Sequence, residues 1–244
     1  MPANKRNAHT VDGVASLPAE EARARVSTLG VSAMLATAGG FLDGFTYVGH
    51  GHVFANTVTG NVVLLGINCF SGSWQAGLRH LPAILAFVAG VSTAQAIQLR
   101  SKHRVCKPPY PTVLLLEISV LLALSLLPAG TADMLFTICI AFAASVQVQM
   151  FREVDGQSYN STFTTGNLRT LSEAAFTWFS EGYSPETARV VKDFSVICLA
   201  FFVGAIGGGY TVQVFGNRAL WCDIVLLALV ALRVQIRLRL PAVN

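Results

Sequence analysis

The chain of 244 residues is 53% hydrophobic and only 12% charged, with a formal net charge of +4. Soluble domains usually carry about a quarter charged residues, so this composition argues against a soluble protein and favours a polytopic membrane protein. It also argues against a nucleic-acid partner, because no basic face on a soluble domain is visible. In a membrane protein, the excess of Lys and Arg is expected to lie in the cytoplasmic loops.

The first 28 residues are polar and lack the apolar core of a signal peptide, so residues 1–28 are expected to form a cytoplasmic tail with a helix over "PAEEARARV". Residues 237–244 are expected to be a second cytoplasmic tail. Between them lie apolar runs of the length that crosses a bilayer. In chain order, these expected spans cover residues 29–48, 81–99, 112–127, 134–150, 193–213 and 219–236.

Neither a Cys-x-x-Cys pair nor a zinc-like spacing occurs among the five cysteines, so no disulfide framework, metal site or cofactor is predicted. His50 and His52 form a His-x-His in a polar loop. Without a third ligand in view, both histidines are expected to be solvated.

Two segments with polar residues interrupt the apolar pattern: "FANTVTGNVVLL" at residues 54–65 and "NSTFTTGNLRTL" at residues 160–171. A shift of 106 residues superimposes the two T-G-N motifs and also places one intramembrane acid on another. We therefore predict an internal duplication, with repeats at residues 29–127 and 134–236. The superimposed pairs are Thr59 and Thr165, Gly60 and Gly166, Asn61 and Asn167, Asp43 and Gln149, and Glu117 and Asp223.

Topology decides how the two repeats are related. If both T-G-N segments were full spans, the chain would have eight helices and the basic cluster at residues 100–107 would face outward, against the positive-inside rule. If each segment dips into the membrane and returns, six spans result. Three spans per half then make the repeats inverted. The expected fold is all-α: about six transmembrane helices as two inverted three-helix repeats, each with a T-G-N half-helix or re-entrant segment.

Irregular backbone at membrane depth is tolerated where it is buried in protein or lines a wet cavity. Thr or Asn can cap the first amides of a half-helix, whose positive end then points into the protein. Inverted-repeat transporters hold solutes at such places. The predicted solute or ion pathway comprises Asp43, Asn56, Thr59, Gly60, Asn61, Glu117, Gln149, Thr165, Gly166, Asn167 and Asp223.

The alternative is that T-G-N only caps helices at the membrane surface. Arg169 and Glu173 would suit an interfacial amphipathic helix after the second motif.

Three acids, Asp43, Glu117 and Asp223, sit in apolar segments, where an ionised side chain costs at least a few kcal/mol. Such groups face a bundle interior and are paired, hydrated or protonated. A protonated acid would allow proton coupling, whereas a structural role would need only a hydrogen bond to a neighbouring helix. Glycines at positions 204, 207, 208 and 209 are predicted to serve close helix packing.

The stretch "GGFLDGFTYVGHGHVFANTVTGNVVLLG" resembles the signature of the YoaK-like family of bacterial inner-membrane proteins, and the second half resembles the same family around Gln149, Arg152 and Gly166. Met150 departs from the family pattern, in which Asn tends to follow the Gln. The resemblance implies a multi-pass inner-membrane protein of about six spans and supplies no activity. The matching residues of the first half are Phe41, Asp43, Thr46, Tyr47, Phe54, Thr59, Gly60 and Asn61.

Three functional classes follow from these observations. A small-solute transporter or channel fits the inverted repeat, the paired broken segments and the intramembrane acids. A membrane-embedded enzyme is disfavoured, because no H-E-x-x-H, G-x-S-x-G or clustered metal carboxylates occur. A scaffold or assembly factor would use the polar motifs for packing only. The expected partners are the lipid bilayer and an unidentified solute or ion, and a homo-oligomer is left open.

Overall fold

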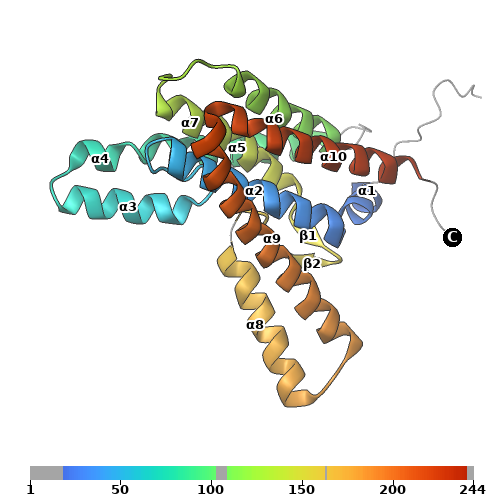
Figure 1. The fold of residues 1–244 in the computed structure, drawn as a ribbon. Coiled ribbons are helices and arrows are strands. Elements are labelled where there is room, and N and C mark those ends of the chain that lie inside the picture. Colours follow the sequence, from blue (N-terminus) through green and yellow to red (C-terminus); the bar gives the residue numbers. More distant parts are fainter. Residues whose placement is uncertain (1–18, 103–108, 163, 241–244) are drawn as a thin grey trace, which may run out of the picture.

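The computed structural model describes residues 19–102, 109–162 and 164–240, almost all of them in helices (Figure 1). The rest of both expected tails and most of the basic cluster at residues 100–107 lie outside the described residues. The elements are α1 (Ala19–Val26), α2 (Leu29–Gly49), α3 (Val58–Phe70), α4 (Trp74–Leu78), α5 (Leu81–Lys102), α6 (Tyr110–Ser125), α7 (Asp133–Met150), β1 (Glu153–Val154), β2 (Gln157–Ser158), α8 (Thr164–Glu181), α9 (Pro185–Phe215), η1 (Gly216–Ala219) and α10 (Leu220–Arg239).

The all-α fold expected for a membrane protein is confirmed. Three helical segments are long and apolar enough to cross a membrane, by length and composition: Trp74–Arg100, Asp133–Met150 and Pro185–Arg239. The last has 55 residues and contains α9, η1 and α10. Val58–Phe70 and Tyr110–Ser125 are shorter apolar helices. The number of spans and the inverted repeat stay predictions.

Charged contacts mark one end of the bundle, here called the basic end. Arg23 of α1 pairs with Glu153 of β1 at 2.9 Å, and Arg189 of α9 pairs with Asp155 in the β-hairpin at 3.0 Å. The Arg25 guanidinium donates to the backbone carbonyl of Leu240, just past α10. The basic end therefore joins α1, the hairpin, the start of α9 and the end of α10.

The opposite end holds the other termini of the same helices. His50, after α2, lies 3.1 Å from the carboxylate of Asp133 at the start of α7. Asn217 of η1 donates to the backbone carbonyl of Leu127, after α6, at 3.2 Å. Helices α2, α6, α7, α9 and α10 thus run between the basic end and the opposite end.

Among the described helices, α2 and α9 share the most extensive contact, and glycines line it. A methyl group added at Gly204 or Gly208 of α9 would lie 2.0 Å from a backbone carbonyl oxygen of α2, that of Thr37 or Phe41. A methyl group added at Gly40 of α2 would likewise collide with the Phe201 carbonyl oxygen. The absence of side chains lets the two backbones touch. The predicted packing role is confirmed for Gly204 and Gly208.

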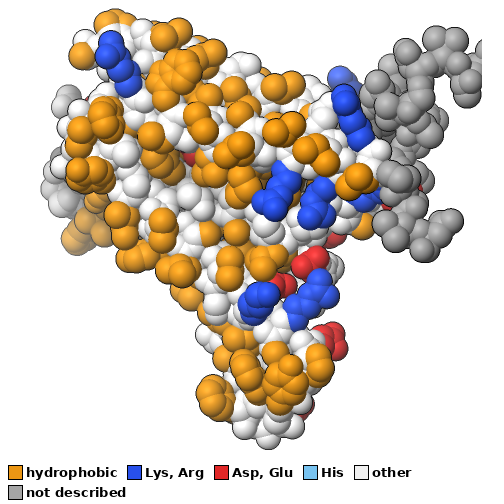
Figure 2. Space-filling view, turned by 45° about the vertical axis from the view of Figure 1, so that its right-hand side comes forward, with side chains coloured by type: hydrophobic (Ala, Val, Ile, Leu, Met, Phe, Trp, Pro, Cys, Tyr) orange, Lys and Arg blue, Asp and Glu red, His pale blue; other side chains and the backbone are white. Residues whose placement is uncertain are grey.

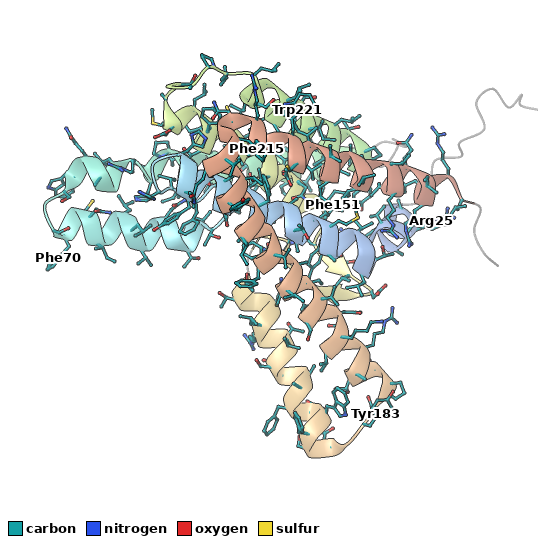
Figure 3. All side chains as sticks on the ribbon, viewed as in Figure 1. Arg25, Phe70, Phe151, Tyr183, Phe215 and Trp221 are labelled. Atoms are coloured by element: carbon teal, nitrogen blue, oxygen red, sulfur yellow. The ribbon has the colours of Figure 1, made fainter. Side chains whose placement is uncertain are left out.

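The remaining helices pack in pairs. α5 lies along α7, where a methyl group at Gly90 would meet the Phe142 carbonyl oxygen at 2.5 Å. α3 packs on α5, α8 packs on α9, and α6 packs on α10. α6 also contacts α7, and α10 also contacts α2. The far ends of α3 and of the α8–α9 hairpin project from the bundle, with Phe70 and Tyr183 at their tips (Figure 3).

Candidate functional site

Both T-G-N motifs occupy the same place in their helices. Thr59-Gly60-Asn61 are the second to fourth residues of α3, and Thr165-Gly166-Asn167 are the second to fourth residues of α8. The expectation that their Thr or Asn caps the first amides is wrong for the described bonds. The N-cap residue Thr57 makes no side-chain cap bond, and the two asparagines bond backward.

Each asparagine closes the loop before its helix through two hydrogen bonds to one peptide unit. Asn61 Oδ1 accepts from the Phe54 amide at 3.0 Å, and its Nδ2 donates to the Phe54 carbonyl at 2.6 Å. Asn167 makes the same pair of bonds with Asn160, at 3.1 and 2.7 Å. Both bridges span seven residues. This arrangement, the asparagine brace, fixes how the chain enters each half-helix.

Asp43 supplies the cap that α3 does not take from its own T-G-N motif. Its carboxylate accepts from the Asn56 amide at 2.7 Å, the Thr57 amide at 3.3 Å and the Thr57 hydroxyl. A buried carboxylate at a helix amino end is stabilised by hydrogen bonds and by the helix dipole. Gln149, which the shift of 106 residues superimposes on Asp43, instead donates to Gln95 of α5 at 3.0 Å.

The loops before the two half-helices meet on α2 at Gly39. Asn56 Nδ2 donates to the Gly39 carbonyl at 3.2 Å, and a methyl group at Gly39 would lie 2.6 Å from the Ser161 carbonyl oxygen. Gly39 lies at the midpoint of α2 and one turn before Asp43. We call the meeting point of Gly39, Asn56 and Ser161 the loop junction. Glycine is required here because any side chain would collide with the second loop.

The loop junction contains two polar atoms without a partner. Asn56 Oδ1 and Ser161 Oγ are buried and make no hydrogen bond to any described residue. Both residues are completely shielded from solvent. Buried polar atoms are normally satisfied, and the exceptions mark strain, bound water or a ligand position.

The predicted pathway residues separate into groups. Asp43 and Asn56 belong to the loop junction, and Asn61 and Asn167 hold the loops that form it. Thr59, Thr165 and Gly166 are exposed, and the nearest atoms to a methyl group at Gly60 belong to Phe54 and Thr57. Glu117 and Asp223 lie apart from the junction, between α6 and α10.

Sequence reasoning missed Gly39, Ser161 and the two brace partners. The shift of 106 residues does superimpose Phe54 on Asn160. Those two side chains share no chemistry, and the brace uses only their backbone atoms. The positions therefore carry no side-chain pattern that a comparison of the two halves could find.

His50 departs from the expectation of a solvated histidine. It is buried, stacks on Phe136 with ring centroids 4.0 Å apart and borders a pocket of about 560 Å³ that also contains Asn217 and Arg218. Burial lowers the pKa of His50, and the hydrogen bond and charge of Asp133 act in the opposite direction. The expectation was wrong because the Phe45 and Phe136 rings cover this end of the loop.

Long apolar helices that pack against one another define an α-helical integral membrane protein. The family model described as "Protein of unknown function (DUF1275)" matches residues 31–233, and the chain belongs to this family. It is 23% identical over 209 residues to "UPF0700 transmembrane protein YoaK" of Bacillus subtilis (strain 168), covering 84% of this chain and 93% of that protein. The resemblance to the YoaK-like family is confirmed. No solved structure matches.

Proposed function

We propose that this protein is an inner-membrane transporter or channel for a small polar solute, without catalytic activity, and that the solute passes the loop junction. One observation carries the proposal. Two unpartnered, fully buried polar atoms, Asn56 Oδ1 and Ser161 Oγ, lie where two broken segments meet at the middle of α2. Transporters built from inverted repeats hold their solutes at such junctions.

The helix contacts support the inverted repeat within this proposal. A shift of 106 residues relates α2 to α7, α3 to α8 and α6 to α10, and the middle helices α5 and α9 then correspond. Under this relation the α2–α9 contact becomes α7–α5, and the α3–α5 contact becomes α8–α9. The α6–α7 contact becomes α10–α2. A contact pattern that maps onto itself is what an exchange of helices between two repeats produces.

The charge distribution supports six spans with both termini in the cytoplasm. Hydrophobic side chains are spread over the face in Figure 2, and many of its Lys and Arg side chains lie toward the right-hand side, where α10 ends. Arg23, Arg189 and Arg239 belong to the basic end, whereas Arg79 and Arg218 belong to the opposite end. By the positive-inside rule, this distribution supports a cytoplasmic location of the basic end.

The chemistry of the junction favours one class of solute. Asn56 Oδ1 can only accept a hydrogen bond, and Ser161 Oγ can donate or accept one. Asp43 already places a carboxyl group at the amino end of α3, which counters the attraction of that helix end for an anion. We therefore propose a polar solute that offers N–H or O–H donors rather than a small inorganic anion.

The transport proposal is tested with the purified protein. A thermal-shift screen in detergent with amino acids, nucleobases and small anions identifies a stabilising solute, and uptake of that radiolabelled solute is then measured in proteoliposomes. Ser161→Ala should raise the KM for uptake about 3- to 10-fold, because one hydrogen bond to the solute is lost. Ser172→Ala on the exposed side of α8 is the matched control. Unchanged uptake by Ser161→Ala would remove the junction from the pathway.

The orientation has its own test. In a cysteine-free background, single cysteines at exposed positions 129 and 157 report the two ends of the bundle. A membrane-impermeant maleimide added to whole spheroplasts should label position 129 and should label position 157 only after permeabilisation. The reverse pattern would overturn the proposed topology.

A scaffold role is the second candidate, and a specific observation favours it. The amides of Asn61 and Asn167 and the carboxylate of Asp43 are all engaged in bonds that hold the loops. Polar motifs used in this way need no solute. For a scaffold, no screened solute would shift the Tm, and Ser161→Ala would leave the stability of the protein unchanged.

A further inference from the structure

A second buried polar site lies between α6 and α10, away from the loop junction. Glu117 of α6 and Asp223 of α10 are 2% and 1% exposed, and their carboxyl groups are close enough for their charges to interact. Glu117 Oε2 and both carboxyl oxygens of Asp223 make no hydrogen bond to any residue in the described parts of the chain.

Leucines enclose the two acids on both helices. Leu114 and Leu121 lie one turn before and after Glu117, and Leu220 and Leu227 stand in the same relation to Asp223. All four leucines are completely buried and belong to one apolar cluster. A shift of 106 residues superimposes each leucine and acid of α6 on its counterpart in α10. The pair is therefore one acid from each half of the chain, held in matching apolar surroundings.

Two ionised carboxylates cannot both persist in this position. Each would be a desolvated charge without a counter-ion, and the two would also repel each other. A metal cation would need several further oxygen ligands, which leucine side chains do not provide. A proton needs no further ligand, because a protonated carboxyl group is neutral and loses most of the cost of burying a charge.

Other titratable groups on the elements packed against the pair are engaged or located elsewhere, as far as the structure describes them. Asp43 caps α3, Asp133 pairs with His50, and Arg23 pairs with Glu153. Arg25 bonds to Glu21 and to the Leu240 carbonyl, Arg218 borders the pocket at the opposite end, and Arg233 lies against Gly30 and Met34. Tyr47 stacks on Phe54, Tyr110 packs against Phe151, and Cys222 is exposed. The remaining groups are Cys139 of α7 and, in the last turn of α10, Arg237 and Arg239.

We infer that Glu117 and Asp223 form a proton-binding site inside the membrane, in which at least one of the two carboxyl groups keeps its proton at neutral pH. The bound proton neutralises one carboxylate, and its release leaves two repelling charges between α6 and α10. These helices connect the two halves of the chain, so proton release would loosen the contact between the halves. Coupling of this change to solute movement rests on the proposed function; proton binding itself does not.

Infrared spectroscopy of the full-length protein in liposomes tests the proton site without any solute. A protonated carboxyl group has a carbonyl stretch that a carboxylate lacks, and the band shifts on exchange into D2O. We expect this band at neutral pH in the wild type. The single variants Glu117→Gln and Asp223→Asn should each shift or remove it, and the double variant should remove it. Glu173→Gln, an exposed acid on α8, is the control that should leave it unchanged.

The inference is overturned if the difference between wild type and the double variant at neutral pH contains only carboxylate bands. Gln and Asn imitate protonated acids in size and polarity, so the variants are expected to fold. If the double variant does not fold, the exchange variant Glu117→Asp with Asp223→Glu keeps two carboxyl groups. It must then retain the band, since its loss in a folded exchange variant would also contradict the proton site.

Coupling is a separate measurement. Uptake of the solute found by thermal shift should be accelerated by an inward proton gradient in the wild type, and the double amide variant should lose this acceleration completely. Uptake that ignores the gradient would refute coupling and leave the proton site standing. Failure of every solute to enter would contradict the proposed transport function alone, because the infrared band does not depend on it.

Discussion

The two T-G-N units share their framework and differ in what surrounds it. In both, an asparagine at the fourth helical position braces the peptide seven residues earlier. Only the unit at α3 has its start bonded to the carboxylate of Asp43, while the counterpart Gln149 bonds to α5. Asn61 is also within 3.2 Å of the His80 ring. The comparison separates a brace common to both units from an acid that serves one.

The largest expected effect on the free energy of unfolding comes from the contact between α2 and α9, which holds the two units together. A methyl group at Gly208 would lie 2.0 Å from the Phe41 carbonyl oxygen, whereas one at Gly207 would find its nearest atom, in the Phe41 ring, at 3.8 Å. Gly208→Ala should therefore cost about 3 kcal/mol of unfolding free energy, since α2 and α9 must separate. Gly207→Ala should cost little.

Unfolding in detergent, followed by circular dichroism during titration with SDS, measures both variants. Equal stability of Gly208→Ala and Gly207→Ala would show that the two units are not held together by this backbone contact.

Removal of the asparagine brace should have the next largest effect on the free energy of unfolding, and it tests the comparison of the two units directly. Asn61→Leu and Asn167→Leu each remove two bonds to a loop peptide and leave its amide and carbonyl unpaired, which should cost about 2 kcal/mol each. Asn68→Leu is the control, because its side chain bonds only to the Leu64 carbonyl within α3. Losses measured by the same titration should be similar at positions 61 and 167. A neutral Asn167→Leu would restrict the brace to the first unit.

Asp43→Asn measures the part of the first unit that the second does not have. The amide keeps the shape and one acceptor but removes the charge at the amino end of α3, which should cost about 1 kcal/mol. Gln149→Ala at the equivalent position should change the unfolding free energy by less than about 0.5 kcal/mol. A cost at position 149 as large as that at position 43 would mean that the two units are capped alike.

The smallest effect concerns the loop that leads into the first unit. His50 begins this loop, and its counterpart after the shift of 106 residues is Gly156, which cannot titrate. Because burial lowers the pKa of His50 below its usual 6.5, the folded protein binds its proton less readily than the unfolded chain. The neutral histidine therefore contributes stability above about pH 6.5 that is lost as the pH falls through the folded pKa.

In a thermal melt, the Tm difference between wild type and His50→Gln should shrink as the pH is lowered from about 8 to 5.5. A constant difference would show that protonation of His50 is not linked to folding.

The sequence predicted the elements better than their partners. Every expected span lies on a helix, since apolar runs in a membrane protein have few other structures available. The start of α3 and α8 at the T-G-N motifs was also predicted. The brace and the loop junction were not, because they depend on backbone atoms and on Ser161, a residue that no pattern marks. The packing of α2 against α9 was not predicted for a similar reason. The hydrophobic periodicity of one helix does not indicate which other helix packs against it.

The exchange of helices between the halves has a consequence for how the protein is made. α2 ends at residue 49, and the helix whose glycines fit against it does not begin until residue 185. During synthesis, the glycine face of α2 therefore stays uncovered while most of the chain is still being translated. α5 must likewise wait for α7. Neither half can complete its packing alone, so the two halves of the chain assemble as a single unit once α9 and α10 have been made.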